Sequence, residues 1–156
     1  MVSNDTASIN FEIKKRHMNG LKFILIDDNN AYRGVLRTLL IDLYNAQILA
    51  EASNAEDAMK ITKFNEADII LMDVMLPGMN GIELTKRLLW IHNSRLKVLA
   101  ITMHTDKIYL TSLIEAGFKG CIFKTNLVNQ LSDALIAVTG GRLYFPQSIL
   151  LEQQNK

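Results

Sequence analysis

The feature that most constrains the fold is a regular alternation of two kinds of segment. Short apolar runs have the length of buried strands, and the longer stretches between them carry apolar residues every three or four positions, as one helical face does. The expected strands are 21–26, 46–52, 68–72, 96–102 and 119–123. The expected helices are 30–44, 54–64, 81–93, 105–117 and 126–141. This order predicts an α/β fold, a five-stranded parallel sheet that is doubly wound, with helices on both faces.

Composition and charge narrow the class of protein. The chain has 156 residues and a formal net charge of +1, so no overall field directs it to nucleic acid or to anionic lipid. A single cysteine, Cys121, excludes an intramolecular disulfide and a cysteine-based zinc site. No apolar run has membrane-spanning length, and the N-terminus lacks the pattern of a signal peptide. We therefore expect a cytoplasmic protein that does not bind membranes.

The same patterning predicts the domain boundaries. Residues 1–20 are polar and carry no apolar stripe, so we expect a flexible N-terminal leader. One folded domain is expected over 21–140, and 141–156 are expected to be a C-terminal tail or linker with one short helix after Pro146.

Polar side chains stand where four of the five expected strands end. Asp27 and Asp28 follow the first strand, Asp73 follows the third, Thr102 ends the fourth and Lys124 follows the fifth. In a parallel sheet these ends lie along one edge, which is where such sheets bind ligands. The sequence therefore predicts that three carboxylates, a hydroxyl and an ammonium converge there.

Charge indicates which chemistry suits this group. Three nearby carboxylates repel one another unless a cation joins them. Oxygen ligands of this type favour Mg²⁺, and a carboxylate beside Mg²⁺ can attack phosphorus to give an aspartyl phosphate. Lys124 would neutralise charge on the transferred group, and Thr102 could donate a hydrogen bond to it. We expect Asp73 to be the residue that accepts the phosphoryl group.

Four segments resemble the receiver domain of bacterial two-component response regulators. They are "ILIDDNNAYRGVLRTLL", "DIILMDVMLPGMNGIEL", "VLAITMH" and "GFKGCIFKTN", and the likeness runs through residues 21–140 in order and spacing. Together with "GGRLYFPQSI", they are most similar to the branch whose receivers precede a LuxR-type helix-turn-helix domain. The resemblance implies a flavodoxin-like fold and a cognate histidine kinase as phosphoryl donor.

The resemblance also assigns roles at the metal site. It implies that Asp73 is phosphorylated and contacts the metal, that Asp28 binds Mg²⁺ directly, and that Asp27 binds it through water. The backbone carbonyl of Met75 would supply a third protein ligand.

Further roles concern phosphoryl binding and switching. Thr102 would be the switch hydroxyl and Lys124 the phosphate-binding lysine. Met75 and His104 occupy the two positions that modulate dephosphorylation in this family. Cys121 stands where relatives commonly carry the switch aromatic residue, and a thiol cannot swing a ring between two positions. We therefore expect the segment 103–110, with Tyr109, to carry the switch.

Several readings of function remain open at this stage. The first is a phospho-accepting receiver that changes partner binding and catalyses only its own phosphorylation and dephosphorylation. The second is a phosphorelay intermediate that passes the phosphoryl group to a histidine phosphotransfer protein. A third, from another class, is a Mg²⁺-dependent phosphohydrolase with an aspartyl nucleophile, although Met75 stands where its general acid is usually found. A receiver-like scaffold that is never phosphorylated is a fourth.

The expected partners are the cognate kinase and a second copy of the chain. The chain itself is not expected to bind nucleic acid directly. Two alternatives remain: the protein is a single-domain regulator, or DNA binding comes through a C-terminal helix-turn-helix domain beyond residue 156.

Overall fold

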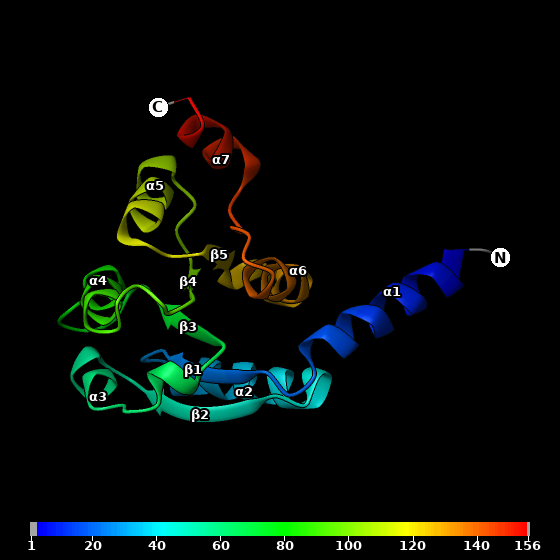
Figure 1. The fold of residues 1–156 in the computed structure, drawn as a ribbon, viewed down its shortest axis with the longest axis horizontal. Coiled ribbons are helices and arrows are strands. Elements are labelled where there is room, and N and C mark those ends of the chain that lie inside the picture. Colours follow the sequence, from blue (N-terminus) through cyan, green and yellow to red (C-terminus); the bar gives the residue numbers. More distant parts are fainter. Residues whose placement is uncertain (1–2, 156) are drawn as a thin grey trace.

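The computed structural model describes residues 3–155 and forms a five-stranded parallel sheet between two layers of helices (Figure 1). The strands are β1 (Lys22–Ile26), β2 (Gln47–Ala52), β3 (Ile69–Asp73), β4 (Val98–Thr102) and β5 (Gly120–Phe123). The helices are α1 (Ser3–Met18), α2 (Asn30–Tyr44), α3 (Ala55–Met59), α4 (Gly81–Ile91), α5 (Lys107–Ala116), α6 (Leu127–Thr139) and α7 (Gln147–Gln153), with 3₁₀ turns η1 (Phe64–Glu66) and η2 (Lys124–Asn126). The predicted fold class is confirmed.

The order of the strands determines where a site can form. The sheet runs β2-β1-β3-β4-β5, so the chain moves outward from β1 to β2 and then crosses back to β3 on the other side of β1. The strand order therefore reverses between β1 and β3, and ligands bind at the carboxyl edge of such a reversal point. Asp27 and Asp28 directly follow β1, and Asp73 is the last residue of β3.

Alternate residues of each strand enter opposite cores. In β1, Ile24 and Ile26 pack in a core with α3, α4 and α5, whereas Phe23 and Leu25 pack with α2 and α6. Both faces of the sheet are thereby covered, which explains why the strands are continuous apolar runs.

One helix end and one helix cap differ clearly from the prediction, whereas the other helix limits lie within two residues of it. Asn54 caps α3 as expected, since its side chain accepts the Asp57 N–H, but the helix ends at Met59 instead of continuing to residue 64. β-Branched residues follow it, and the chain then turns through η1 to bury Phe64. The predicted cap of α5, Thr105, is also wrong by one position, because Asp106 accepts the Tyr109 N–H.

The expected flexible leader is largely helical in the structure. Helix α1 extends away from the sheet at its N-terminal end (Figure 1), and Ile9 and Phe11 are exposed there. Its other end packs, because Met18 is fully buried in the core with α2 and α6 and Lys14 forms an ion pair with Asp133 of α6 at 2.7 Å. Because only one end of this helix packs, its residues form no continuous apolar stripe, and the sequence pattern therefore does not predict it. In the described part of the chain, no helix is long and apolar enough to cross a membrane.

The C-terminal segment packs along the far edge of the sheet. The Tyr144 carbonyl accepts the Cys121 N–H at 2.8 Å, and its N–H donates to the Lys119 carbonyl at 2.9 Å, so it forms a single parallel bridge to Gly120 of β5. Phe145 and Ile149 are buried in the same core as Cys121. Helix α7 then lies against α5 (Figure 1). The tail therefore covers part of the apolar core, and its short helix after Pro146 is present as predicted.

Candidate functional site

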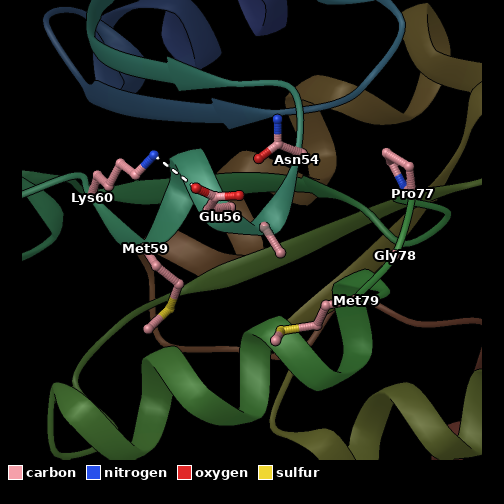
Figure 2. A pocket seen from close by; sticks show the side chains of 8 residues that line it. Asn54, Glu56, Met59, Lys60, Pro77, Gly78 and Met79 are labelled. Carbon is pink, nitrogen blue, oxygen red and sulfur yellow. Dashed lines mark hydrogen bonds and ion pairs between the residues drawn. The ribbon is translucent and has the colours of Figure 1, made fainter.

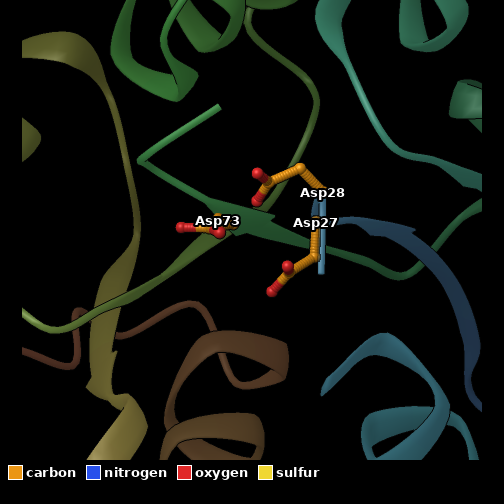
Figure 3. Close-up of side chains that lie close together, drawn as sticks. All are labelled: Asp27, Asp28 and Asp73. Carbon is orange, nitrogen blue, oxygen red and sulfur yellow. The ribbon is translucent and has the colours of Figure 1, made fainter. Parts of the chain in front are cut away.

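Three carboxylates meet at the edge where β1 and β3 end. One carboxylate oxygen from each of Asp27, Asp28 and Asp73 lies within 4.8 Å of the others (Figure 3). Asp27 and Asp73 are only 2% and 4% exposed, whereas Asp28 faces solvent. The sequence placed these residues at strand ends, and the fold brings them together.

Lys124 connects two of these carboxylates. It begins η2 directly after β5, and its side chain crosses to the centre of the edge. Its Nζ donates to Oδ2 of Asp73 at 3.0 Å and to Oδ2 of Asp27 at 3.2 Å. The lysine side chain is only 16% exposed, so these charge-assisted bonds are shielded from water.

The other oxygens of the buried carboxylates are held by backbone. Asn29 donates its N–H to Oδ1 of Asp27 at 2.8 Å, and Met75 donates its N–H to Oδ1 of Asp73 at 3.0 Å. The guanidinium of Arg33 donates to the backbone carbonyl of Asp27 and so secures the turn after β1. Backbone N–H groups and the Lys124 ammonium thus hold both carboxylates in place. These hydrogen bonds offset the cost of burying the charges of Asp27 and Asp73.

The electrostatics of the site leave room for a cation. Burial raises the pKa of the Asp73 carboxyl, and Asp27 adds to that rise while Lys124 and the Met75 N–H oppose it. Burial alone would lower the pKa of Lys124, but its bonds to Asp73 and Asp27 raise it overall, so the lysine is charged at neutral pH. One ammonium against three carboxylates leaves two negative charges uncompensated, which matches a divalent ion.

The spacing of the carboxylates also fits such an ion. Two oxygens bound to one Mg²⁺ are about 3 Å apart at neighbouring positions and about 4 Å apart at opposite ones, so carboxylate oxygens within 4.8 Å of one another need only a modest inward movement to bind it. The exposed Asp28 side chain can make that movement, since no hydrogen bond or ion pair within residues 3–155 engages it. The residues present therefore fit a hard divalent cation.

Thr102 lies on the neighbouring strand but is engaged elsewhere. Its hydroxyl is fully buried, donates to the hydroxyl of Tyr109 at 3.4 Å and accepts the His104 N–H at 3.1 Å. The rings of His104 and Tyr109 stack at 4.8 Å with a tilt of 50°. Strand pairing sets Asp73 opposite Ile101, so Thr102 is one residue further along the same edge.

Comparison with known proteins decides what this arrangement is. The family model described as the response regulator receiver domain matches residues 23–136, which include the three aspartates, Thr102 and Lys124. The chain belongs to this family. It is a receiver domain of the kind that works in two-component signalling.

Individual relatives agree with this assignment. The receiver is 29% identical over 129 residues to the response regulator UvrY of Escherichia coli strain K12, covering 83% of this chain and 59% of UvrY. It is also 29% identical over 129 residues to the response regulator GacA of Pseudomonas syringae pv. syringae, covering 83% of this chain and 60% of GacA. The chain thus spans about three fifths of these relatives.

Solved structures support the fold. A two-component response regulator of the LuxR family from Aurantimonas sp. SI85-9A1 superimposes with a TM-score of 0.77 at 27% identity, covering 88% of this chain and all of that one. The isolated receiver domain of RcsB from Salmonella enterica serovar Typhimurium, with the phosphomimetic BeF₃⁻, has a TM-score of 0.73 at 22% identity, covering 84% of this chain and 96% of that chain.

Three of the predicted site residues have their side chains outside the charged cluster. Cys121 is 2% exposed in the core beneath the edge, and burial raises its pKa to about 12, so its thiol is an apolar group at neutral pH. The Met75 side chain is 59% exposed, and the residue contacts the cluster through its backbone N–H. His104 reaches Thr102 through its backbone and Tyr109 through its ring.

Tyr32 is a residue of this receiver's site that the apolar spacing of the helix predicted over 30–44 indicates only as a packing position. Its ring lies under the ammonium of Lys124, with 4.5 Å from Nζ to the ring centroid. The signal available in the sequence was position, because Tyr32 falls in the first turn of a helix that starts just after Asp27 and Asp28.

A separate hollow of about 760 Å³ lies between α3 and the loop after β3. Figure 2 shows Met59 and Met79 facing each other across it, with the ion pair of Glu56 and Lys60 at its rim. None of the three aspartates lines it, so this hollow is distinct from the charged edge of the receiver.

Proposed function

We propose that this receiver accepts a phosphoryl group on Asp73 from a histidine kinase, with Mg²⁺ bound at the acidic cluster, and that phosphorylation changes how it binds a partner. The observation that carries the proposal is the position of Lys124, whose Nζ bridges Asp73 and Asp27 beside a third carboxylate. A buried carboxylate with an adjacent ammonium and a cation site has what a phosphoryl acceptor needs.

The chemical step follows from this arrangement. A carboxylate oxygen of Asp73 attacks the phosphorus of a phosphohistidine, and the P–O bond forms as the P–N bond breaks. The imidazole leaves with the bonding electron pair and takes up a proton. Lys124 remains beside Asp73 and neutralises charge on the phosphoryl oxygens. The Thr102 hydroxyl would donate to one of these oxygens, which requires it to leave Tyr109.

Mg²⁺ would be held by the side chains of Asp28 and Asp73, by the Met75 carbonyl, and by Asp27 through water. When bound, the ion stabilises negative charge on the transferring group. Asp28 is the ligand that the protein itself holds least, since its carboxylate is exposed and free to turn toward the ion.

Asp28→Ala should weaken Mg²⁺ binding by about 10–100-fold, the range typical for loss of a group that supports a metal. Titration of Mg²⁺ followed by fluorescence or calorimetry measures this. Asp42→Ala, at an exposed acidic position near the far end of α2, is the matched control and should bind Mg²⁺ like the parent. Equal affinity in the Asp28 variant and the parent would contradict the assignment.

One alternative function would use the same site residues, and the other needs an acidic residue that this site does not provide. A phosphorelay intermediate would need no further residue, so a reconstituted transfer to a histidine phosphotransfer protein separates it from a terminal regulator. A phosphohydrolase needs an acid two residues after the nucleophile, and the exposed thioether of Met75 cannot donate a proton. Activity as a transcription regulator would depend on a DNA-binding domain outside these residues.

Incubation with acetyl phosphate tests the proposal directly. With Mg²⁺ the intact mass should rise by one phosphate, and with EDTA it should not. The added group should be lost at alkaline pH, as an acyl phosphate is. Absence of any gain with Mg²⁺ and excess acetyl phosphate would show that this receiver does not work as a phosphoryl acceptor.

A further inference from the structure

Tyr32 has a contact that packing alone does not require. It lies in the first turn of α2, where Asn29 accepts its N–H at 3.0 Å, and its ring turns back under the ammonium of Lys124. The ring is half-buried against the core that α2 and α6 form with the sheet. Its face therefore lies against the ammonium that joins Asp27 and Asp73.

The hydroxyl of Tyr32 adds nothing to this contact. Its oxygen is shielded from solvent and has no hydrogen-bond partner in the part of the chain that the structure describes. A buried hydroxyl without a partner is a cost to the fold, so the gain from this side chain must come from the ring. Burial, together with Asp27 and Asp73, raises the Tyr32 pKa to about 12, which keeps the ring neutral at physiological pH.

Lys124 is a residue that benefits from such a support. A lysine side chain is a flexible four-carbon stem, and its ammonium has no preferred plane. Two carboxylates draw Nζ toward the edge at 3.0 Å and 3.2 Å, and the ring contacts it at 4.5 Å from the centroid. An aromatic face attracts a cation electrostatically, and more strongly where water is excluded.

We propose that Tyr32 is a positioning residue for phosphoryl transfer, whose ring holds the Lys124 ammonium against Asp73. This inference rests on the proposed function, because it concerns the rate of the same reaction. The ring of Tyr32, and not its hydroxyl, positions the ammonium. Asp27, Asp73 and Tyr32 then define the position of the ammonium before any phosphoryl donor arrives.

The experiment compares three substitutions in the full chain. Tyr32→Leu and Tyr32→Met remove the ring, and Tyr32→Phe keeps it. The rate of the one-phosphate mass gain with acetyl phosphate and Mg²⁺ should fall roughly 3–10-fold in the first two, as expected for loss of a shielded cation–π contact. Tyr32→Phe should stay within about twofold of the parent and melt no lower, since it loses only an unpartnered hydroxyl. Methionine is included because its flexible chain fills the same space if leucine disturbs folding.

Mg²⁺ affinity provides the readout that separates positioning from general damage. Tyr32 contacts the ammonium and not a proposed metal ligand, so all three variants should bind Mg²⁺ within about twofold of the parent. If the leucine and methionine variants were phosphorylated as fast as the parent, the inference would be overturned. The same would follow from a rate loss in the phenylalanine variant equal to theirs, or from Mg²⁺ binding that weakens in parallel with the rate. If the parent itself gains no phosphate, the proposed function fails and this inference falls with it.

Discussion

Replacing Asp73 with asparagine should abolish the one-phosphate mass gain and, at neutral pH, raise the melting temperature. The first effect is all-or-none, because an amide oxygen is not a nucleophile toward acetyl phosphate. The second follows from burial, since Asp73 is only 4% exposed and lies beside Asp27. The asparagine keeps the shape of the side chain and an oxygen that can accept from Lys124, while it removes one of three neighbouring negative charges.

The pH dependence of this stabilisation has a definite sign. Burial raises the pKa of Asp73 above its ordinary value of 3.8, so the folded state holds the proton more tightly than the unfolded state does. The stability that the protonated group contributes is complete below that ordinary value, and it is lost as pH rises through the raised native pKa. The ionised carboxylate therefore costs stability at pH 7. The advantage of the asparagine variant should shrink as pH falls toward 4.

Melting curves at pH 7 and near pH 4, with intact mass after acetyl phosphate treatment, test both effects. We expect a gain of roughly 2–4 °C at pH 7, the shift that 1 kcal/mol produces in a chain of this length. Asp42→Asn, exposed on α2, is the control and should change neither property. Phosphate gain retained by the Asp73 variant would refute the assignment of the acceptor. A lower melting temperature at pH 7 would show that the Lys124–Asp73 pair outweighs the cost of burial.

Much of the fold and of the charged edge could be predicted from the sequence. Strands buried on both faces must be continuous apolar runs, so a carboxylate at the end of such a run, as at Asp73, stands out without any structure. Parallel strand ends share an edge, which placed Asp27, Asp28 and Lys124 near Asp73 before their distances were known.

Other contacts left no local signal in the sequence. Phe145 is buried in the core that contains Cys121 because the C-terminal segment pairs with β5. Tyr144 makes this pairing with its backbone N–H and carbonyl, groups that every residue except proline has. Tyr32 fitted the apolar spacing of α2, so periodicity assigned it to packing although its ring also meets Lys124. Apolar periodicity predicts which face of a helix is buried, but it does not predict which residues contact that face.

A glycine close to the acceptor provides the second large effect. Gly81 is the first residue of α4, and its N–H donates to the carbonyl of Val74 at 2.8 Å. A Cβ at this position would lie 2.5 Å from the backbone oxygen of Asp73 and 2.8 Å from Cα of Val74. Both obstacles are backbone atoms, so no side chain can move aside, and the end of β3 or the start of α4 must shift.

Gly81→Ala should therefore destabilise the fold by about 1–3 kcal/mol, the usual cost of overpacking. It should also slow phosphorylation by at least about tenfold, because displacing a reacting group by a fraction of an ångström is enough to lose rate. Chemical denaturation and the rate of mass gain with acetyl phosphate measure the two effects.

Gly34→Ala is the matched control for this substitution. Gly34 lies inside α2 with nothing within 4 Å of an added Cβ, and alanine is the better helix former. The same chemical change should therefore stabilise the protein by roughly 0.5–1 kcal/mol and leave the phosphorylation rate unchanged. Opposite signs at the two positions would show that space beside the Asp73 backbone is what requires glycine at position 81. A neutral or stabilising effect of Gly81→Ala would contradict this account. It would mean that β3 and α4 can separate without moving Asp73, and that the tight packing at this edge is not needed for the reaction.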